Sequence, residues 1–457
     1  MANAACIKLE DIENPAKRGK YVVCIIGCSR LGLLHACLFA EAGFNVICTD
    51  VNQAITDALS KGKVSHLRSM VEPIIRKHMH EGKLRVNNDL KAAVSQSEIL
   101  VIAVPVDVDE KGEVNYSGLG RVLKNVGLGI RKGTLVVVVS TLTLGATEKV
   151  VKETLESTSG FKADLDFFLA YSPVIFPESQ TLETLVNYKR VVAASGGISL
   201  KAASTILKTI GKAGIIETND LKAAEALALF ETSKDAIIAA FAKEFASLCE
   251  HIGVDYFTVQ SLARMKEGSW FLNSSPIYQD GCAFLDFLLN EAEGLDLKLK
   301  VSVAAVKVNS ETIKHAVRLV KEALKSCGKT LRRAEISIIG VSQTPNASDV
   351  PKSFVKKLME ALEAKGANIK VYDPYLSSKM LADLKPFNVK KGLAEAVEGT
   401  DCIIISAGHE QFRKLDLAKL KLMVKMPAAI VDFEGLIEPQ KAEVEGFKYR
   451  GFGRGAH

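Results

Sequence analysis

The chain has 457 residues, of which 48% are hydrophobic and 25% are charged, a composition typical of globular proteins in solution. At ~150 residues per domain, this length predicts about three domains. The net charge of +6 comes from scattered lysines and arginines without an aromatic-rich basic groove, so we expect no nucleic-acid partner. The small positive excess suits an anionic small substrate, although solvated surface lysines give the same balance.

The sequence also argues against membrane attachment and a metal centre. The first twenty residues mix acidic and basic side chains and read as neither a signal peptide nor an anchor. No apolar run approaches the ~18 residues of a membrane-spanning helix. Nine cysteines are spread along the chain without metal-ligand or disulfide-framework spacing. We therefore expect no membrane partner, no metal and a reducing, cytoplasmic location.

Residues 21–52 carry the most informative pattern, in which a strand, a glycine-bearing turn, a helix, a second strand and an acid follow one another. A β-branched run of five residues fits a buried parallel strand, and helical spacing follows two glycines. The expected segments are a strand at Val22–Ile26, a turn between Gly27 and Gly32, a helix at Leu33–Ala42 and a strand at Phe44–Cys48 before Asp50.

This layout predicts a dinucleotide site. A pyrophosphate would bind at the helix N-terminus, and Asp50 would accept a hydrogen bond from a ribose 2′-hydroxyl but repel a 2′-phosphate. The sequence therefore favours NAD over NADP. Ser29 replaces the middle glycine of the usual turn, where its Cβ takes room from the phosphates, although its hydroxyl or Arg30 could contact them.

The βα alternation continues to about residue 215 and predicts a mostly parallel, doubly wound sheet. Further strands are expected at 97–106, 133–141, 166–174 and 189–195. Ligands of such sheets bind at the carboxyl ends of the strands, where Pro105, Ser140, Thr141 and Ser172 fall. The predicted cofactor-binding residues are Gly27, Ser29, Arg30, Leu31, Gly32, Asp50, Pro105, Ser140 and Thr141.

The chain changes character after this domain. Asp220–His251 contains neither Gly nor Pro and has apolar residues at helical spacing, which predicts a long helix used as a spine or an interface. A second helical block follows from Phe284 to about Ser326. Strands are again expected at 334–340, 367–375, 401–408 and 428–435, with a helix at Ser353–Lys365. We predict an N-terminal Rossmann-like domain at 1–215, a central long-helix domain at 216–328 and a second Rossmann-like α/β domain at 329–457.

This order of segments resembles the UDP-glucose/GDP-mannose dehydrogenase family over essentially the whole chain. The resemblance rests on Gly27, Gly32 and Asp50 together with several local motifs. These motifs are IAVPVDVDEKGEV, VVVSTLTLGATE, AYSP, FASLCEHIGVD, the Cys282 segment, GVSQTPNASD, VYDPY and GHEQFRKLDL.

The resemblance implies an enzyme that oxidises the C6 alcohol of a UDP- or GDP-sugar to a carboxylate with two NAD, for polysaccharide biosynthesis. Cys282 matches the nucleophile that forms a thioester, and Asp286 matches an acid one helical turn later, on the same face. Thr232 falls at an oxyanion-stabilising position. The resemblance also implies a homodimer through the middle helix, and substrate contacts from Ser172, Asn346, Asp349 and Ser353.

Several family positions carry other residues. Val174 stands where the family has an acid/base Glu, and Ala228 stands where it has a Lys. Residues 277–280 replace most of the glycines expected before the nucleophile. In the nucleotide motifs, Thr344 stands where the family has a Lys, and Pro351 and Glu434 stand where it has an Arg. A valine transfers no proton, and loss of one oxyanion donor costs ~10²–10³ in rate.

Three interpretations follow. The protein is a working nucleotide-sugar 6-dehydrogenase in which other residues replace those that are missing. Alternatively, it is a catalytically impaired or inactive paralogue that still binds NAD or a nucleotide sugar. A third interpretation is an NAD enzyme with altered substrate and chemistry.

Overall fold

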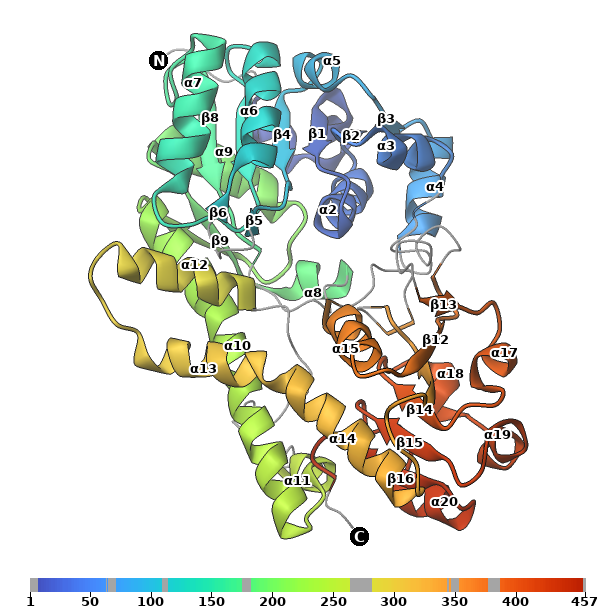
Figure 1. Ribbon diagram of the computed structural model, residues 1–457. Helices are drawn as coiled ribbons and strands as arrows, with labels where there is room; N and C mark the ends of the chain where they lie inside the picture. The colour runs from blue at the N-terminus through green and yellow to red at the C-terminus, as the bar shows by residue number, and fades with distance from the viewer. Residues whose placement is uncertain are drawn as a thin grey trace. The chain divides into compact units, whose positions relative to one another are not determined.

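The computed structural model describes residues 7–62, 64, 71–108, 114–174, 182–263, 282–342, 345–346, 353–376 and 387–454. The chain divides into two compact units (Figure 1). The first comprises Met1–Ser233 and Ala283–Lys298, and the second comprises Lys234–Cys282 and Leu299–His457. No helix in the described ranges combines the length and the hydropathy needed to cross a bilayer.

The first unit is built on an eight-stranded sheet with the order β10-β9-β8-β7-β4-β1-β2-β3. The six neighbouring strands β8, β7, β4, β1, β2 and β3 run parallel, whereas β8 and β9 pair antiparallel. A separate two-stranded ladder joins β5 (Asp107–Val108) and β6 (Val114–Asn115). The strands are β1 Val22–Ile26, β2 Asn45–Thr49, β3 Leu84–Val86, β4 Ile99–Ile102, β7 Leu135–Val138, β8 Phe168–Tyr171, β9 Arg190–Ala193 and β10 Ile215–Thr218.

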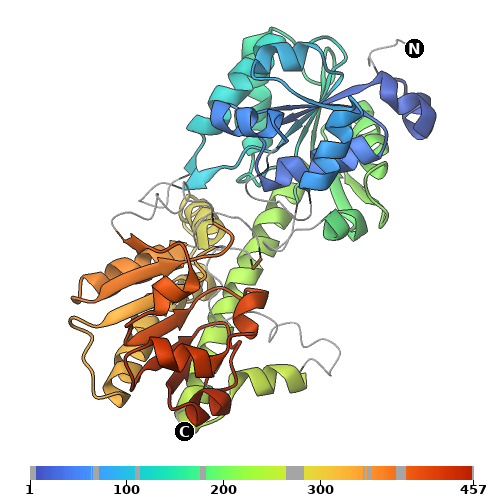
Figure 2. The ribbon, with the colours of Figure 1, turned by 90° about the vertical axis from the view of Figure 1, so that its right-hand side faces the viewer.

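Helices cover both faces of this sheet (Figure 2). The helices of the first unit are α1 Leu9–Glu13, α2 Arg30–Glu41, α3 Gln53–Ser60, α4 Glu72–His80, α5 Leu90–Ser95, α6 Ser117–Gly129, α7 Glu153–Ser159, α8 Leu182–Asn187, α9 Gly197–Lys208 and α12 Cys282–Glu293, with a 3-10 turn, η1, at Pro15–Lys20 and a π-helical turn, η2, at Thr147–Lys152.

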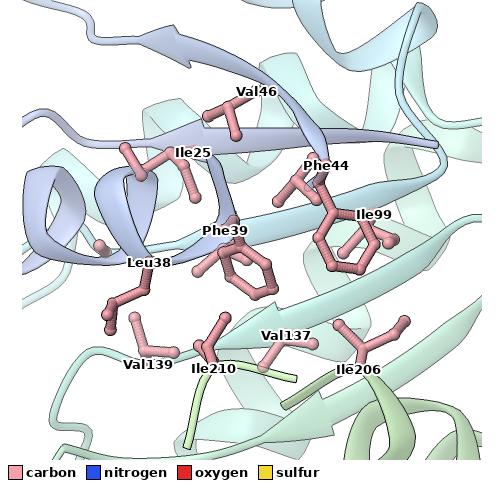
Figure 3. Close-up of a cluster of buried hydrophobic side chains, with 14 of the residues drawn as sticks. Ile25, Leu38, Phe39, Phe44, Val46, Ile99, Val137, Val139, Ile206 and Ile210 are labelled. Atoms are coloured by element: carbon pink, nitrogen blue, oxygen red, sulfur yellow. The ribbon is translucent and has the colours of Figure 1, made fainter. Parts of the chain in front are cut away.

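Alternating side chains of β1 explain why its sequence is a continuous apolar run. Val23 and Ile25 pack in one core with α2 and α9, whereas Cys24 and Ile26 pack in the opposite core with α5 and α6. In the first core, the rings of Phe39 and Phe44 meet edge to face with centroids 5.6 Å apart (Figure 3). The strand is therefore buried on both faces, as a doubly wound sheet requires.

The second unit contains a six-stranded sheet with all strands parallel and the order β13-β12-β11-β14-β15-β16. Its core packs α14 and α15 on one face and α17 to α20 on the other. The strands are β11 Glu335–Ile339, β12 Asn368–Tyr372, β13 Asn388–Val389, β14 Cys402–Ile405, β15 Ala429–Asp432 and β16 Lys448–Gly451. Its helices are α11 Tyr256–Ala263, α13 Lys300–Ser310, α14 Thr312–Ser326, α15 Ser353–Glu363, α17 Leu393–Val397, α18 Glu410–Arg413, α19 Leu417–Met423 and α20 Pro439–Val444.

The predicted fold class is confirmed, since two parallel α/β domains have helices between them in the chain. The long helix predicted at Asp220–His251 is α10, at Leu221–Ile252, which begins in the first unit and ends in the second. The helical block predicted from Phe284 contains α12, α13 and α14. The helix expected to begin at Leu33 begins at Arg30, because Ser29 already has the extended backbone of an N-cap.

Candidate functional site

The turn after β1 has the geometry of a dinucleotide site. Gly27 has a φ of +98°, and a Cβ at this position would lie 2.6 Å from the carbonyl oxygen of Ala103. A Cβ at Gly32 would lie 1.8 Å from the carbonyl oxygen of Gly27. Side chains are therefore excluded at both positions, and the N-terminus of α2 comes close to the strand ends.

Ser29 is accommodated in this turn without strain. Its φ of −68° and ψ of 179° are open to any L-residue, and its hydroxyl donates to the carbonyl oxygen of Ala103 at 3.5 Å. The replacement of the middle glycine leaves the turn intact.

A pocket of about 180 Å³ lies at the carboxyl ends of β1, β4 and β7. It contains five of the predicted cofactor-binding residues, and the sheet brings these together from positions more than a hundred residues apart. Its lining residues are Ser29, Leu31, Ala103, Val104, Pro105, Val106, Ser140 and Thr141.

Asp50 follows β2, the strand next to β1, and is partly exposed. Its Oδ2 accepts the backbone N–H of Cys28 at 2.7 Å, and its Oδ1 accepts that of Asn52 at 2.9 Å. Each carboxylate oxygen retains a second acceptor site for a ribose hydroxyl. No basic side chain stands at 51–53 to neutralise a 2′-phosphate. The glycine cradle, the helix N-terminus and the acid together fit NAD.

The predicted catalytic pair shares one helix. Cys282 is the first residue of α12, and Asp286 follows one turn later; the side chain of Cys282 lies outside the described part of the chain. Asp286 is partly buried, and this burial raises its pKa. The altered glycine segment at 277–280 also lies outside the described residues.

Two of the substituted family positions are apolar and buried. Val174 packs in the first core, and Ala228 is buried on α10. The hydroxyl of Thr232 donates within the helix, to the carbonyl oxygens of Ala228 at 2.7 Å and Leu229 at 3.1 Å. To stabilise an oxyanion, Thr232 would have to release these bonds. Neither Val174 nor Ala228 can transfer a proton or donate a side-chain hydrogen bond.

Only some of the predicted substrate-binding side chains lie within the described residues. Ser172 is buried and donates to the carbonyl oxygen of Val191 at 2.8 Å. Asp349 lies outside the described residues, as does the side chain of Ser353 at the start of α15. Glu434 lies beside Gly408, since a Cβ built on that glycine would be 3.7 Å from the Glu434 carboxylate. A carboxylate therefore stands where a family Arg was expected.

Asn346 belongs to a buried polar cluster at the carboxyl ends of β11, β12 and β14. Its N–H donates to Nδ1 of His409 at 2.8 Å, and its side-chain oxygen accepts from the hydroxyl of Tyr375 at 3.2 Å. Since Nδ1 is an acceptor, Nε2 of His409 carries the proton and faces Asp373 at 3.2 Å and Ser342 at 3.1 Å. Burial raises the pKa of Asp373, but the bonds from His409 and the backbone outweigh it, and the pKa lies below its usual value. The family motifs GVSQTPNASD, VYDPY and GHEQFRKLDL contain all of these residues, but only Asn346 among them was predicted as a site residue.

Comparison with known proteins identifies the family. Residues 21–210 match the NAD binding domain of the UDP-glucose/GDP-mannose dehydrogenase family, and residues 337–439 match its UDP binding domain. The chain is 26% identical over 441 residues to UDP-glucose 6-dehydrogenase TuaD of Bacillus subtilis, covering 95% of this chain and 93% of the relative. It is 27% identical over 451 residues to UDP-N-acetyl-D-mannosamine dehydrogenase of Pyrococcus horikoshii, covering 95% and 99%.

Solved structures show the same fold. A UDP-D-ManNAc dehydrogenase from Pyrococcus horikoshii superposes with a TM-score of 0.82 at 22% identity, covering 95% of this chain and 99% of that one. A UDP-glucose dehydrogenase from Pyrobaculum islandicum also gives 0.82, at 23% identity and with coverage of 95% and 98%. The predicted resemblance and the predicted cofactor are confirmed: the chain belongs to the UDP-glucose/GDP-mannose dehydrogenase family, and its cofactor is NAD.

Proposed function

We propose that this protein oxidises the C6 alcohol of a UDP-sugar to a carboxylate, with Cys282 as the nucleophile. The observation that carries the proposal is the register of α12, in which the cysteine stands at the first helical position and Asp286 one turn later. The UDP binding domain matched at 337–439 supports UDP over GDP.

In this proposal, the first domain holds NAD through the turn at Gly27 and Gly32, the pocket beside Ser29, and Asp50. When bound, NAD supplies the hydride acceptor for both oxidations. The Cys282 thiol would add to the aldehyde carbon to give a thiohemiacetal. Loss of a hydride and a proton in the second oxidation would turn this adduct into a thioester, which water would cleave to the sugar acid and the free thiol. A thiol at a helix N-terminus is more easily ionised, which favours this addition. Burial raises the pKa of Asp286, which favours a role for this carboxyl group in proton transfer.

The substitutions at Val174 and Ala228 predict slow turnover. They remove one proton-transfer group and one donor to developing oxyanion charge, and each such donor is worth ~10²–10³ in rate. The proposed enzyme is therefore a weaker catalyst than a family member with both groups.

We assign residues 1–215 to NAD binding, 216–328 to the central helical and dimerisation domain, and 329–457 to nucleotide-sugar binding. Dimerisation is supported by one face of α10, where Phe241, Leu248 and Ile252 are 49%, 51% and 61% exposed. Their spacing of seven and four places them on one side of the helix. Such an apolar stripe fits a homodimer interface. The seven described cysteines are free thiols, which supports a reducing, cytoplasmic location.

The test is the pair of variants Cys282→Ser and Cys327→Ser. We expect Cys282→Ser to abolish formation of the sugar acid while NAD still binds with wild-type affinity. Cys327 is a buried free thiol in the second unit and serves as the matched control, with turnover retained. Undiminished acid production by Cys282→Ser would refute the proposed nucleophile.

A further inference from the structure

The loop between β7 and η2 is held by buried and partly buried side chains that come from distant parts of the sequence. This loop, residues 139–146, includes Ser140 and Thr141 on the wall of the cofactor pocket. Glu225 of α10 is fully buried, and its two carboxylate oxygens accept the N–H groups of Gly145 at 2.5 Å and Thr147 at 2.7 Å. Glu225 lies 78 to 80 residues from these partners in the sequence.

Two tyrosines hold the other part of the loop. The hydroxyl of Tyr116 accepts the N–H of Thr143 at 3.2 Å and shares a hydrogen bond with the Thr143 hydroxyl at 2.7 Å. The hydroxyl of Tyr171, which is fully buried on β8, accepts the N–H of Leu142 at 3.4 Å. Three loop N–H groups and that of Thr147, the first residue of η2, are thus satisfied by three side chains, although a loop of this kind has no ladder partner for them.

Retaining a buried carboxylate here has a physical cost, which its hydrogen bonds to the loop offset. An unpaired charge in such a site is strongly unfavourable, so Glu225 and the loop stabilise each other in this conformation. The contacts fix the backbone just after Thr141. A shift of that backbone would move the Ser140 and Thr141 wall of the pocket.

The sheet order indicates which part of NAD meets this wall. Asp50 follows β2 and lies where the adenosine ribose binds in such folds. The N-terminus of α2 follows β1 and lies where the pyrophosphate binds. Ser140 and Thr141 follow β7, on the far side of β4 from β1. A dinucleotide that crosses the sheet in this direction reaches the wall with its nicotinamide end.

We propose that Glu225, Tyr116 and Tyr171 are positioning residues that hold Ser140 and Thr141 against the nicotinamide end of NAD. The inference rests on the proposed NAD-dependent function, and it adds a group of residues that act through the loop and not by touching the cofactor. Glu225→Gln replaces one carboxylate oxygen by an NH₂ group, which cannot accept a loop N–H.

The experiment compares the binding of NAD with that of ADP-ribose, which lacks only the nicotinamide, by titration calorimetry on the full-length protein. We expect Glu225→Gln to weaken NAD binding by about tenfold, equivalent to ~1.4 kcal/mol, and to leave ADP-ribose binding within about twofold. Tyr116→Phe, which removes one hydroxyl, should weaken NAD in the same selective way by a smaller factor.

Glu98→Gln is the matched control. Glu98 also accepts a backbone N–H, that of Val22 at 2.9 Å, but it stands at the amino end of β4, the opposite edge of the same sheet. This variant should bind both ligands like the wild type.

Equal losses for the two ligands in Glu225→Gln would indicate a general structural role and overturn the inference. Unchanged NAD affinity would overturn it as well. If Glu225→Gln does not fold, Tyr116→Phe alone tests the inference. Wild-type NAD affinity in Tyr116→Phe would then overturn it. Failure of the wild type to bind NAD would instead contradict the proposed function, so the two failures are distinguishable.

Discussion

Asp50 and Asp373 occupy equivalent places in the two parallel sheets, and their carboxylates accept equivalent pairs of backbone N–H groups. Oδ2 of Asp50 accepts from Cys28 at 2.7 Å, and Oδ2 of Asp373 accepts from Val341 at 2.8 Å. In both cases Oδ1 accepts from the residue two positions after the acid, at 2.9 Å. A glycine with positive φ directly follows β1 and β11, with φ values of +98° at Gly27 and +78° at Gly340.

The two acids differ in what covers them. Asp373 is only 3% exposed, and the protonated Nε2 of the fully buried His409 lies 3.2 Å from its Oδ2. Asp50 has no such cover among the described residues and is partly exposed. The second sheet therefore has the same turn geometry as the dinucleotide site, but His409 covers its acid and prevents contact with a ribose. We infer that only the first domain binds NAD.

The same substitution at the two acids should give opposite results. Asp50→Asn should weaken NAD binding about tenfold and reduce the preference for NAD over NADP, because the charge that repels a 2′-phosphate is lost. Asp373→Asn should leave NAD affinity unchanged but lower the free energy of unfolding by about 3 kcal/mol, since several hydrogen bonds to a buried charge are disturbed. Calorimetry and denaturant unfolding of both variants provide the measurements. Loss of NAD affinity in Asp373→Asn would contradict the assignment.

Ser29→Gly should tighten NAD binding by about fivefold, or ~1 kcal/mol. Removal of the Cβ lets the backbone approach the pyrophosphate, and glycine at an N-cap costs the helix only a few tenths of a kcal/mol. The dissociation constant of NAD measures the effect. A weaker complex would mean that the serine hydroxyl itself binds a phosphate oxygen.

The stability of the first domain should depend on the protonation of His35. Its Nδ1–H donates to the carbonyl oxygen of Leu31 at 2.8 Å, and its Nε2 accepts from the buried Arg190 at 3.4 Å. Burial and this guanidinium lower the pKa of His35 to about 3. In the unfolded chain the pKa is ~6.5, so the stabilisation is complete above pH 6.5 and is lost as the pH falls towards 3.

At pH 5, His35 should account for a loss of about 2 kcal/mol relative to pH 7. His35→Gln, which cannot titrate, should lose correspondingly less between the two pH values in denaturant unfolding. An identical loss in the wild type and the variant would show that another group causes the acid sensitivity.

The proposed homodimer predicts that Leu248→Glu converts the protein to a monomer, because a charge would be buried in the apolar face of α10. Leu422→Glu is the control, since Leu422 is 86% exposed on α19. Sedimentation velocity distinguishes the two species. A wild-type monomer at micromolar concentration, or an unaffected Leu248→Glu dimer, would be incompatible with this interface.

The sequence predicted the central strands well and the edge strands poorly. β1 and β7 are continuous apolar runs because both of their faces are buried. β3, β10, β13 and β16 were not predicted. They lie at the sheet edges and have exposed positions, so their sequences lack that run.

The same contrast holds for the candidate site. Gly27, Gly32 and Asp50 were predictable because the turn is local, and each position is restricted by contacts within one strand–helix–strand unit. Glu225 was not predicted, because its role depends on N–H groups about 80 residues away that only the fold brings near it. No residue type or spacing in the sequence predicts such a contact.

The most direct test of the proposed function is the number of NADH formed per UDP-sugar consumed by the purified protein, measured by absorbance over a panel of UDP- and GDP-sugars. Two NADH per sugar, with the sugar acid as product, is the expected result. One NADH per sugar would indicate an enzyme that stops at a carbonyl product. No NADH across the panel, from protein shown to bind NAD, would contradict the dehydrogenase proposal and favour a paralogue that binds its ligands without turning them over.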